Sequence, residues 1–403
     1  MLTGNQYIMH PDTSKYVPAK EAMSLLGISQ STLYSYVSRK LIRSRKSHSN
    51  KRIHKYNYDD IVKLLEKKKI QVAETIAQQS LQWGTPVLES SITLIQDNMI
   101  FYKGRSIASL VDMYSFEQVA TLLWTGSTEN YQNLFSEHQI ATDKSSINNS
   151  LTDIQKLLLD IEKSDLILLL KEDKPTQGGI ILSSIVQSIT QNLTNETIAN
   201  KLAQFYCPNE VHASELINTA LIVIADHELN ASSFTARVVA STEANLFQVI
   251  VAGLSALSGY KHGATAFEIK KMVNELNENL TIEKNLLKRI NGGGKIIGFG
   301  HTLYPNGDIR AKILLNKIKR FYGDTKDYQM MKLIMDKCIE FTDQLPNVDF
   351  SLYFLAKLLH QDDEFAIFLF ALGRIAGWVA EAIEQYQEDK LIRPRAKYIG
   401  IKP

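Results

Sequence analysis

The sequence predicts a mainly α-helical protein in which a small N-terminal module precedes a large helical body. Apolar residues recur at three- and four-residue spacing along most of the 403-residue chain, which is the period of a helix with one buried face. Only 9 prolines are present, and no series of alternating strands at regular spacing occurs. Hydrophobic residues make up 44% of the chain and charged residues 22%, a composition typical of a globular protein with two or three domains.

The two cysteines, Cys207 and Cys338, are too few and too far apart for a disulfide framework or a cysteine metal site. We therefore expect a protein of the reducing cytoplasm. Residues 1–16 contain no apolar run, so we expect no signal peptide. No uninterrupted apolar run of about 18 residues is present, so we expect no membrane span.

The formal net charge of +2 hides a local excess of positive charge. Segment 39–55 contains eight lysines and arginines and no acidic residue, whereas the rest of the chain is net acidic. Such a block favours a local anionic partner. The alternative is a solvated loop whose charge serves no partner.

The N-terminal module covers residues 18–69. Its first helix is "AKEAMSLLG", in which Ala22, Leu25 and Leu26 share one face and Gly27 ends the helix. The short "IS" that follows predicts a tight turn before a second helix.

The second half of the module predicts another helix and a basic hairpin. Ser29 is placed to cap the helix "QSTLYSYVSRKLI". The stretch "RSRKSHSNKRIHKYN" has a polar centre of serine and asparagine, which predicts a hairpin with Ile53 and Tyr56 on the returning strand. The charged helix "YDDIVKLLEKKK" closes the unit, with Asn57 as its cap.

Two short helices, a tight turn and a basic hairpin resemble the winged helix-turn-helix of the MerR and excisionase type. The resemblance implies that the second helix enters the major groove of duplex DNA while the wing touches phosphates. The alternative is a module that has lost DNA and serves as a protein-contact arm. The residues suited to DNA contacts are Ser31, Thr32, Tyr34, Ser35, Arg39, Arg43, Arg45 and Arg52.

A polar linker over residues 70–82 joins the module to the helical body. Within that body one stretch departs from the helical pattern. Residues 91–104, "SITLIQDNMIFYKG", are rich in β-prone side chains around Asp97 and Asn98, which predicts a hairpin.

A glycine-rich loop, "GGGKIIGFGH", spans residues 292–301. It is not a Walker phosphate loop, because Ile296 follows the lysine where serine or threonine is required. It is not a Rossmann fingerprint, because Ile297 stands where the last glycine belongs. What remains is a permissive backbone that lets main-chain groups approach a ligand, followed by His301 and Arg310.

Three more polar residues lie at turns or helix ends among small and apolar neighbours: His227, His262 and Asp349. A metal site is not expected at His227, since "HELNA" lacks the second histidine of H-E-x-x-H and no cysteine lies nearby. Together with the short motifs around them, these residues resemble the citrate synthase family. The matching words run from about residue 83 to the C-terminus and are "SFEQVATLLWTG", "ADHELNASSFTARV", "GYKHGA", "GFGH", "PNVDF", "GRIAGWVAEAIEQ" and "LIRPRAKYIG".

The resemblance implies a large helical domain (83–262 and 364–403), a small helical domain (263–363) and a homodimer. It implies an acyltransferase that condenses acetyl-CoA with oxaloacetate and hydrolyses the thioester to citrate and CoA, a reaction of the tricarboxylic acid cycle. Acetyl-CoA is then a co-substrate, and no other cofactor is expected. Two alternatives are a 2-methylcitrate synthase that uses propionyl-CoA, and a DNA-binding transcription regulator that uses this body as a metabolite sensor.

The resemblance also implies roles for the four polar residues. Asp349 would be the base that removes a proton from the acyl methyl group, and His262 would donate to the thioester oxygen. His301 would donate to the oxaloacetate carbonyl, and His227 would hold the oxygens of the same substrate. Such a reaction needs a positioned base together with donors that prevent full charge on the enolate.

The substrate carboxylates require fixed cations, and the fork of arginine pairs with both carboxylate oxygens. The family's positions match Arg310, Arg374 and Arg393, the last of which would reach the partner subunit's site. The glycine-rich loop would recognise acyl-CoA by its main chain, through Gly292, Gly293, Gly294, Ile297, Gly298 and Gly300.

Some positions differ from the sequence motifs of the family. Thr302 and Pro305 stand where the family commonly has arginine and lysine, so two partners for the CoA phosphates are missing. Ile309 replaces a proline before Arg310. Lys261 precedes His262, and a cation there predicts a lower pKa for the histidine.

Overall fold

The structure is a computed structural model that describes residues 16–46, 54–65, 88–135, 147–169, 171–263, 265–277, 281–396 and 398–401. It contains two compact units, residues 1–89 and 90–403.

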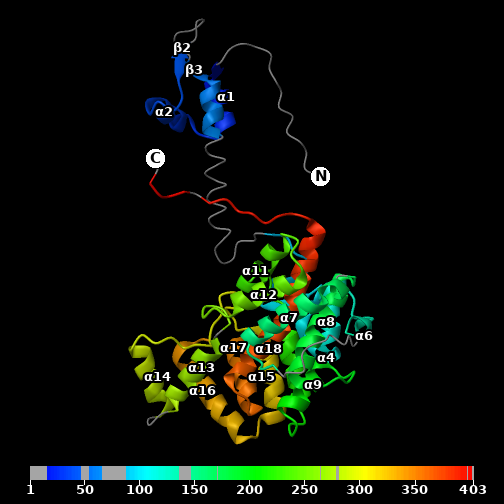
Figure 1. Cartoon of the computed structure of the whole chain (residues 1–403). Coiled ribbons are helices and arrows are strands. Elements are labelled where there is room, and N and C mark those ends of the chain that lie inside the picture. The colour runs from blue at the N-terminus through cyan, green and yellow to red at the C-terminus, as the bar shows by residue number, and fades with distance from the viewer. Residues whose placement is uncertain are drawn as a thin grey trace. The chain divides into compact units, whose positions relative to one another are not determined.

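The N-terminal unit combines two helices with a small antiparallel sheet (Figure 1). The sheet has the order β1-β3-β2, and residues 58–65 add a helical segment after β3. The elements are β1 (Tyr16–Pro18), α1 (Ala19–Leu26), α2 (Gln30–Ser38), β2 (Ser44–Lys46) and β3 (His54–Asn57).

The end of α1 and the start of α2 lie where the sequence places them, whereas α2 ends at Ser38 and not at Ile42 as predicted. Gly27 adopts the left-handed conformation, with φ of 61°, and ends α1. The Ser29 hydroxyl accepts a hydrogen bond from the backbone N–H of Thr32 and caps α2. The prediction that Leu25 shares the buried face of α1 with Ala22 and Leu26 is wrong, because Leu25 is 40% exposed. The buried face of α1 is narrow and consists of Ala22 and Leu26.

The predicted basic hairpin is confirmed by antiparallel pairing of β2 with β3, in which Arg45 faces Lys55. Tyr56 is buried on the returning strand, and Asn57 caps the helical segment by accepting from the backbone N–H of Asp60. The tip of the hairpin, including Arg52 and Ile53, and the predicted linker 70–82 lie outside the described residues.

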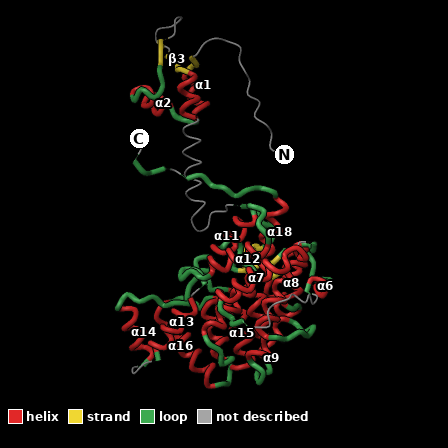
Figure 2. The backbone as a smooth tube through the Cα atoms, in the orientation of Figure 1, coloured by secondary structure: helices red, strands yellow, loops and turns green. Residues whose placement is uncertain are grey.

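The second unit is helical apart from one small sheet (Figure 2). Its elements are β4 (Thr93–Gln96), β5 (Met99–Tyr102), β6 (Arg105–Ser106), α4 (Ile107–Met113), α5 (Phe116–Thr125), α6 (Tyr131–Leu134), α7 (Leu151–Leu169), α8 (Lys174–Thr190), α9 (Ile198–Tyr206), α10 (Ala213–Ile224), α11 (Ala231–Ala240), α12 (Leu246–Leu257), α13 (Thr265–Leu276), α14 (Ile282–Asn291), α15 (Ile309–Tyr322), α16 (Lys326–Thr342), α17 (Val348–Leu358) and α18 (Asp363–Glu388).

Helix α18 is the centre of this unit and packs against α5, α8, α10, α11, α12, α13 and α17. Gly253 of α12 permits one of these contacts, because a Cβ there would lie 2.6 Å from the ring of Trp378. Among the described helices, α18 alone is long and apolar enough to cross a bilayer, but its apolar window is wholly buried in the unit. Helices around a hydrophobic core thus form the body, and the boundaries of 263 and 363 between its two predicted domains stay a prediction.

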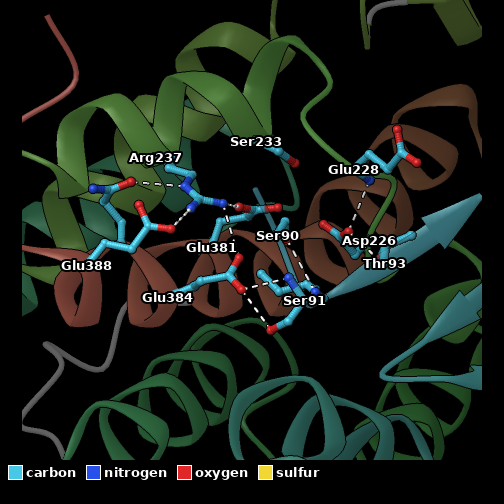
Figure 3. Close-up of polar contacts among 12 residues, drawn as sticks. Ser90, Ser91, Thr93, Asp226, Glu228, Ser233, Arg237, Glu381, Glu384 and Glu388 are labelled. Carbon is cyan, nitrogen blue, oxygen red and sulfur yellow. Dashed lines mark hydrogen bonds and ion pairs between the residues drawn. The ribbon is translucent and has the colours of Figure 1, made fainter. Parts of the chain in front are cut away.

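Arg237 joins α11 to the C-terminal half of α18. Its buried guanidinium donates to the Gln385 side chain and pairs with carboxylates of three glutamates of α18 (Figure 3). These are Glu381 at 2.9 Å, Glu384 at 3.1 Å and Glu388 at 2.9 Å. We call this set the Arg237 cluster.

The hairpin expected around Asp97 and Asn98 is confirmed as β4–β5, and both residues have positive φ, as a tight hairpin turn requires. The hairpin contacts two loops of the body. The Thr93 hydroxyl donates to the Asp226 carboxylate, and the Asn98 amide donates to the carbonyl of Gly307 at 2.8 Å. It therefore connects the turn after α10 with the loop before α15.

Candidate active site

Five segments of the second unit bring the predicted site residues together. His227 lies in the turn between α10 and α11, and His262 lies between α12 and α13. The α14–α15 loop carries His301, while Asp349 begins α17 and Arg374 lies within α18. Charge interactions connect these groups, so residues scattered over the sequence share one buried environment.

His227 and His301 form an aromatic cluster with Tyr304. The His227 and His301 rings lie 5.5 Å apart, and the His301 and Tyr304 rings lie 4.8 Å apart. The Nε2 atom of His227 lies 2.6 Å from the Tyr304 hydroxyl. Tyr304 was not among the residues selected from the sequence, although it lies within the "GHTLYPNGDIR" stretch that carries His301 and Arg310.

The backbone determines which nitrogen of His301 can donate. The N–H of Leu303 donates to Nδ1 of His301 at 3.2 Å, so Nδ1 is an acceptor. Burial, followed by the charge of Arg310, lowers the pKa of His301 to about 4. The ring is therefore neutral near pH 7 and carries its one proton on Nε2, which can donate to a substrate oxygen.

His262 is also neutral, for a different reason from the one predicted. Burial, followed by Arg374, lowers its pKa to about 4. Lys261 does not contribute, and its ammonium lies 5.8 Å from the ring centre of Tyr260. The Nε2 atom of His262 lies 2.8 Å from the hydroxyl oxygen of Ser232. The pKa of His262 is thus lowered by an arginine that is distant in the sequence and not by the adjacent lysine.

Asp349 is held at the first turn of α17, where its backbone N–H donates to the Asn347 side chain. Burial raises the pKa of its carboxyl to about 6, although Arg310 opposes the shift. A carboxylate with such a pKa is mostly ionised at pH 7 and is more basic than an exposed aspartate. This is the behaviour required of a general base.

Arg310 is held by Asp308 through two hydrogen bonds, from Nε to Oδ1 at 3.0 Å and from Nη2 to Oδ2 at 2.8 Å. Burial alone would lower the pKa of Arg310, but Asp308 reverses the effect and raises it. Oδ2 of Asp308 also accepts from the backbone N–H of Val348 at 3.0 Å. Asp308 therefore joins the guanidinium to the start of the helix that carries the base.

Arg374 is buried, and its Nε donates to the carbonyl of Ile224 at 2.8 Å. Its Nη2 has no hydrogen-bond partner among the described residues. Burial lowers the pKa of Arg374 to about 10, so it remains a cation at neutral pH. A buried cation with an unused donor is suited to binding a carboxylate.

A cavity of about 520 Å³ lies beside the glycine-rich loop. Of the residues predicted to bind acyl-CoA, Gly294, Ile297 and Gly298 line it. The sequence did not single out its other lining residues, which come partly from the ends of α14 and α16: Ile290, Lys295, Ile296, Phe299, Phe341, Thr342 and Gln344.

The first three glycines of the loop end helix α14. The N–H groups of Gly292, Gly293 and Gly294 donate to carbonyls within α14. These three N–H groups are therefore already hydrogen-bonded within the chain. Gly294 and Gly298 line the cavity, and Gly298 and Gly300 have positive φ of 84° and 74°.

Arg393 lies on an exposed C-terminal segment that follows α18. In the N-terminal unit, Arg43 is held by Asp60 through Nε and Nη2, each at 2.9 Å. Arg45 lies over the Tyr16 ring at 4.1 Å. The remaining DNA-contact residues that the structure describes, Ser31, Thr32, Tyr34, Ser35 and Arg39, belong to α2 or its C-terminal end.

Comparisons with known proteins place the sequence of the second unit in one family. The family model described as "Citrate synthase, C-terminal domain" matches residues 80–168 and 179–395. The chain is 30% identical to citrate synthase 2 of Bacillus subtilis (strain 168), over 79% of this chain and 94% of that protein. It is 28% identical to 2-methylcitrate synthase of Mycobacterium tuberculosis (strain H37Rv), over 76% of this chain and 86% of that protein.

Solved structures share the fold. Citrate synthase from Thermotoga maritima superposes with a TM-score of 0.66 at 22% identity, over 81% of this chain and 96% of that one. A ternary complex of citrate synthase from Thermoplasma acidophilum with carboxymethyl coenzyme A and oxaloacetate also has a TM-score of 0.66, at 21% identity, over 79% and 95% of the two chains. The described strands and helices of the N-terminal unit precede the residues that the family model matches.

Proposed function

The chain belongs to the citrate synthase family, and we propose that it condenses acetyl-CoA with oxaloacetate and hydrolyses the product thioester to citrate and CoA. The observation that carries this proposal is Asp349, a partly buried carboxyl whose desolvation raises its pKa to about 6. It shares its environment with two buried arginines, Arg310 and Arg374, and with neutral histidines. The protein is then an acyltransferase of the condensing type.

The first step is removal of a proton from the methyl group of acetyl-CoA. The Asp349 carboxylate accepts this proton, and the C–H electron pair becomes the enol double bond. His262 is neutral, so one ring N–H is available, and we propose that this N–H donates to the thioester oxygen. The Ser232 hydroxyl oxygen lies 2.8 Å from Nε2 of His262, accepts from the indole N–H of Trp378 at 3.2 Å and donates to Oδ1 of Asn230 at 2.8 Å.

The second step forms the carbon–carbon bond. The enol carbon attacks the ketone carbon of oxaloacetate, and the carbonyl oxygen is protonated through Nε2–H of His301. The proton that Asp349 removed from the methyl group replaces the one given up by the ring, so the carboxylate and the neutral imidazole are both restored. Arg310 and Arg374 hold the two substrate carboxylates, so the ketone is oriented before the attack. Water then cleaves the thioester of the bound product, which releases CoA.

CoA release from acetyl-CoA and oxaloacetate tests this function. We expect turnover by the parent chain and a loss of about 10²- to 10⁴-fold in Asp349→Asn, which has no base. Asp343→Asn is the matched control, because Asp343 is an exposed aspartate with positive φ that asparagine accepts equally well. Absence of turnover in the parent, or equal rates in the two variants, would refute the assignment.

Propionyl-CoA in the same assay tests the alternative of a 2-methylcitrate synthase. An apolar pocket discriminates one methyl group only about 10- to 200-fold, so some turnover of both substrates is expected. A higher kcat/KM for propionyl-CoA would reassign the acyl substrate while leaving the reaction class unchanged.

A second candidate function is binding of duplex DNA by the N-terminal unit, in a regulator that uses the body as a metabolite sensor. The basic strands β2 and β3 and the polar exposed residues of α2 favour it. Arg43 is the least suitable of the predicted contacts, because Asp60 already binds its guanidinium. Arg39 and Lys46 are exposed and are therefore better positions for substitution.

Binding of the full chain to duplex DNA across a salt series tests this second function. We expect log K to fall with log salt, with a slope near −0.9 for each phosphate contact. Arg39→Ala and Lys46→Ala should each weaken binding and reduce the slope by about 1, whereas Lys20→Ala on α1 should not. A slope near zero would exclude a phosphate-binding role for the unit.

We also infer a homodimer, in which Arg393 serves the site of the other subunit. The exposed position of Arg393 supports this proposal, because an exposed side chain is accessible to a second subunit. Light scattering of the full chain measures the assembly, and a monomer with full activity would contradict it.

A further inference from the structure

Tyr304 makes a buried hydrogen bond with His227 that joins two separate parts of the body. The hydroxyl oxygen and Nε2 lie 2.6 Å apart, and the two residues are only 2% and 6% exposed. His227 comes from the turn after α10, whereas Tyr304 comes from the loop that also carries His301 and Arg310. The family's proposed roles for His227 and His301 make no use of this bond.

The protonation states restrict how the bond can form. Burial, followed by the charges of Arg310 and Arg374, lowers the pKa of His227 well below its ordinary value. Burial raises the pKa of the Tyr304 phenol. Near pH 7 a neutral imidazole therefore meets a neutral phenol, and only one proton lies between the two atoms.

The phenol is the donor in this pair. The bond to His227 is the sole hydrogen bond of the Tyr304 hydroxyl within the described residues. If Nε2 carried the proton and donated it, the phenol proton would remain buried without an acceptor, at a cost of about 1–3 kcal/mol. When the phenol donates, both its proton and the Nε2 lone pair are satisfied.

We propose that Tyr304 is a positioning residue that holds His227 in the tautomer with the proton on Nδ1. Nδ1–H is then the ring donor that His227 offers to an oxygen of a bound carboxylate or keto group. Leu303, the preceding residue, sets the opposite tautomer in His301 by donating to its Nδ1. Two consecutive residues of one loop thus prepare two histidines as donors before the substrate binds.

The same loop links these donors to the substrate cation. The Tyr304 ring lies 4.8 Å from the His301 ring, and the Arg310 guanidinium lies 5.5 Å from the Tyr304 ring centre. Removal of the hydroxyl alone should leave these ring contacts in place. Tyr304→Phe therefore isolates the hydrogen bond from the packing.

Nitrogen-15 spectra of histidine-labelled full chain test the inference directly, with the signals of His227 assigned by their loss in His227→Gln. We expect Nδ1–H in the parent and a shift toward the Nε2–H form in Tyr304→Phe. Tyr322→Phe is the matched control, because that buried phenol bonds to Glu210 outside the site. An Nε2–H tautomer in the parent, or identical His227 signals in parent and Tyr304→Phe, would overturn the proposal.

The kinetic consequence rests on the proposed condensation. Tyr304→Phe should raise KM for oxaloacetate roughly three- to tenfold, with little change in KM for acetyl-CoA, as for loss of one ordinary hydrogen bond. Tyr304→Phe should not raise KM for oxaloacetate further when it is combined with His227→Gln, because both changes remove the same donor from the substrate site. Additive losses would show that Tyr304 acts without His227. The spectra need no turnover, so failure of the proposed reaction and failure of this inference are distinguishable.

Discussion

The backbone N–H of Asn347 donates to the carbonyl of Gly298 at 2.9 Å, which joins the turn before the base to the loop before His301. Two further bonds strengthen the junction. The N–H of Gly300 donates to the carbonyl of Leu345 at 2.8 Å, and the Asn347 amide donates to the carbonyl of Gly300 at 3.3 Å. The segments that carry Asp349, the proposed base, and His301, the proposed carbonyl donor, are therefore held together by hydrogen bonds to the backbone.

The acid limb of the pH–rate profile should report Asp349. Its pKa of about 6 requires that kcat/KM fall as pH decreases through 6, because the protonated carboxyl cannot accept a proton. His262 and His301, with pKa values of about 4, should add no limb between pH 6 and 8. Steady-state rates from pH 5 to 8.5 measure this, and a profile that stays flat down to pH 5 would contradict it.

Asp349→Asn should stabilise the protein at neutral pH while abolishing activity. The folded-state pKa of about 6 exceeds the unfolded value of 3.8, so the native state binds more protons between these limits and loses stability as pH rises through them. At pH 8 the ionised carboxyl lowers the free energy of unfolding by up to about 3 kcal/mol. Urea unfolding of parent and variant measures the gain, which should narrow between pH 8 and pH 5. An equal difference at both pH values would count against the buried, ionised base.

Arg374→Lys should weaken oxaloacetate binding although it keeps the charge. Lysine cannot reproduce the bond from Nε to the Ile224 carbonyl together with a second donor toward the substrate. Loss of a charge-assisted hydrogen bond of about 1.5–3 kcal/mol corresponds to a roughly 10- to 100-fold higher KM. Arg320→Lys, on the exposed part of α15, is the control and should leave KM unchanged. Equal KM values for parent and Arg374→Lys would remove Arg374 from the substrate site.

Arg237→Met should strongly destabilise the body without directly affecting the reacting atoms. It leaves the Arg237 cluster with carboxylates and no cation, and breaking such a buried pair costs about 3–5 kcal/mol. Glu381→Gln should be much milder, because burial raises the pKa of Glu381 and Arg237 keeps the carboxylates of Glu384 and Glu388 as partners. Denaturant midpoints compare the two variants.

The surface pair of Lys332 and Asp336 provides the control for the Arg237 cluster. Lys332→Met removes an exposed ion pair, so the midpoint should change little. A similar midpoint for Arg237→Met and Lys332→Met would show that the Arg237 cluster contributes no more than a surface pair.

Local chemistry explains what the sequence by itself determined. Gly27, Ser29 and the Asp97–Asn98 turn end or begin elements through their own backbone preferences, and the structure places them as predicted. Helical periodicity likewise predicts the body around α18. The sequence motifs that contain His227, His262, His301 and Asp349 identify the family, because residue types and their order are properties of the sequence.

Only the tertiary structure decided the states of these residues. The sequence suggested Lys261 as the cause of a lowered pKa in His262, but burial and Arg374, far along the chain, lower it instead. The pairing of Tyr304 with His227 joins residues 77 positions apart, and no spacing rule reveals it. The N–H groups of Gly292, Gly293 and Gly294, three of the residues expected to bind acyl-CoA, donate to carbonyls of α14. Desolvation, hydrogen bonding and charge act through space, so they are determined only after distant segments have packed together.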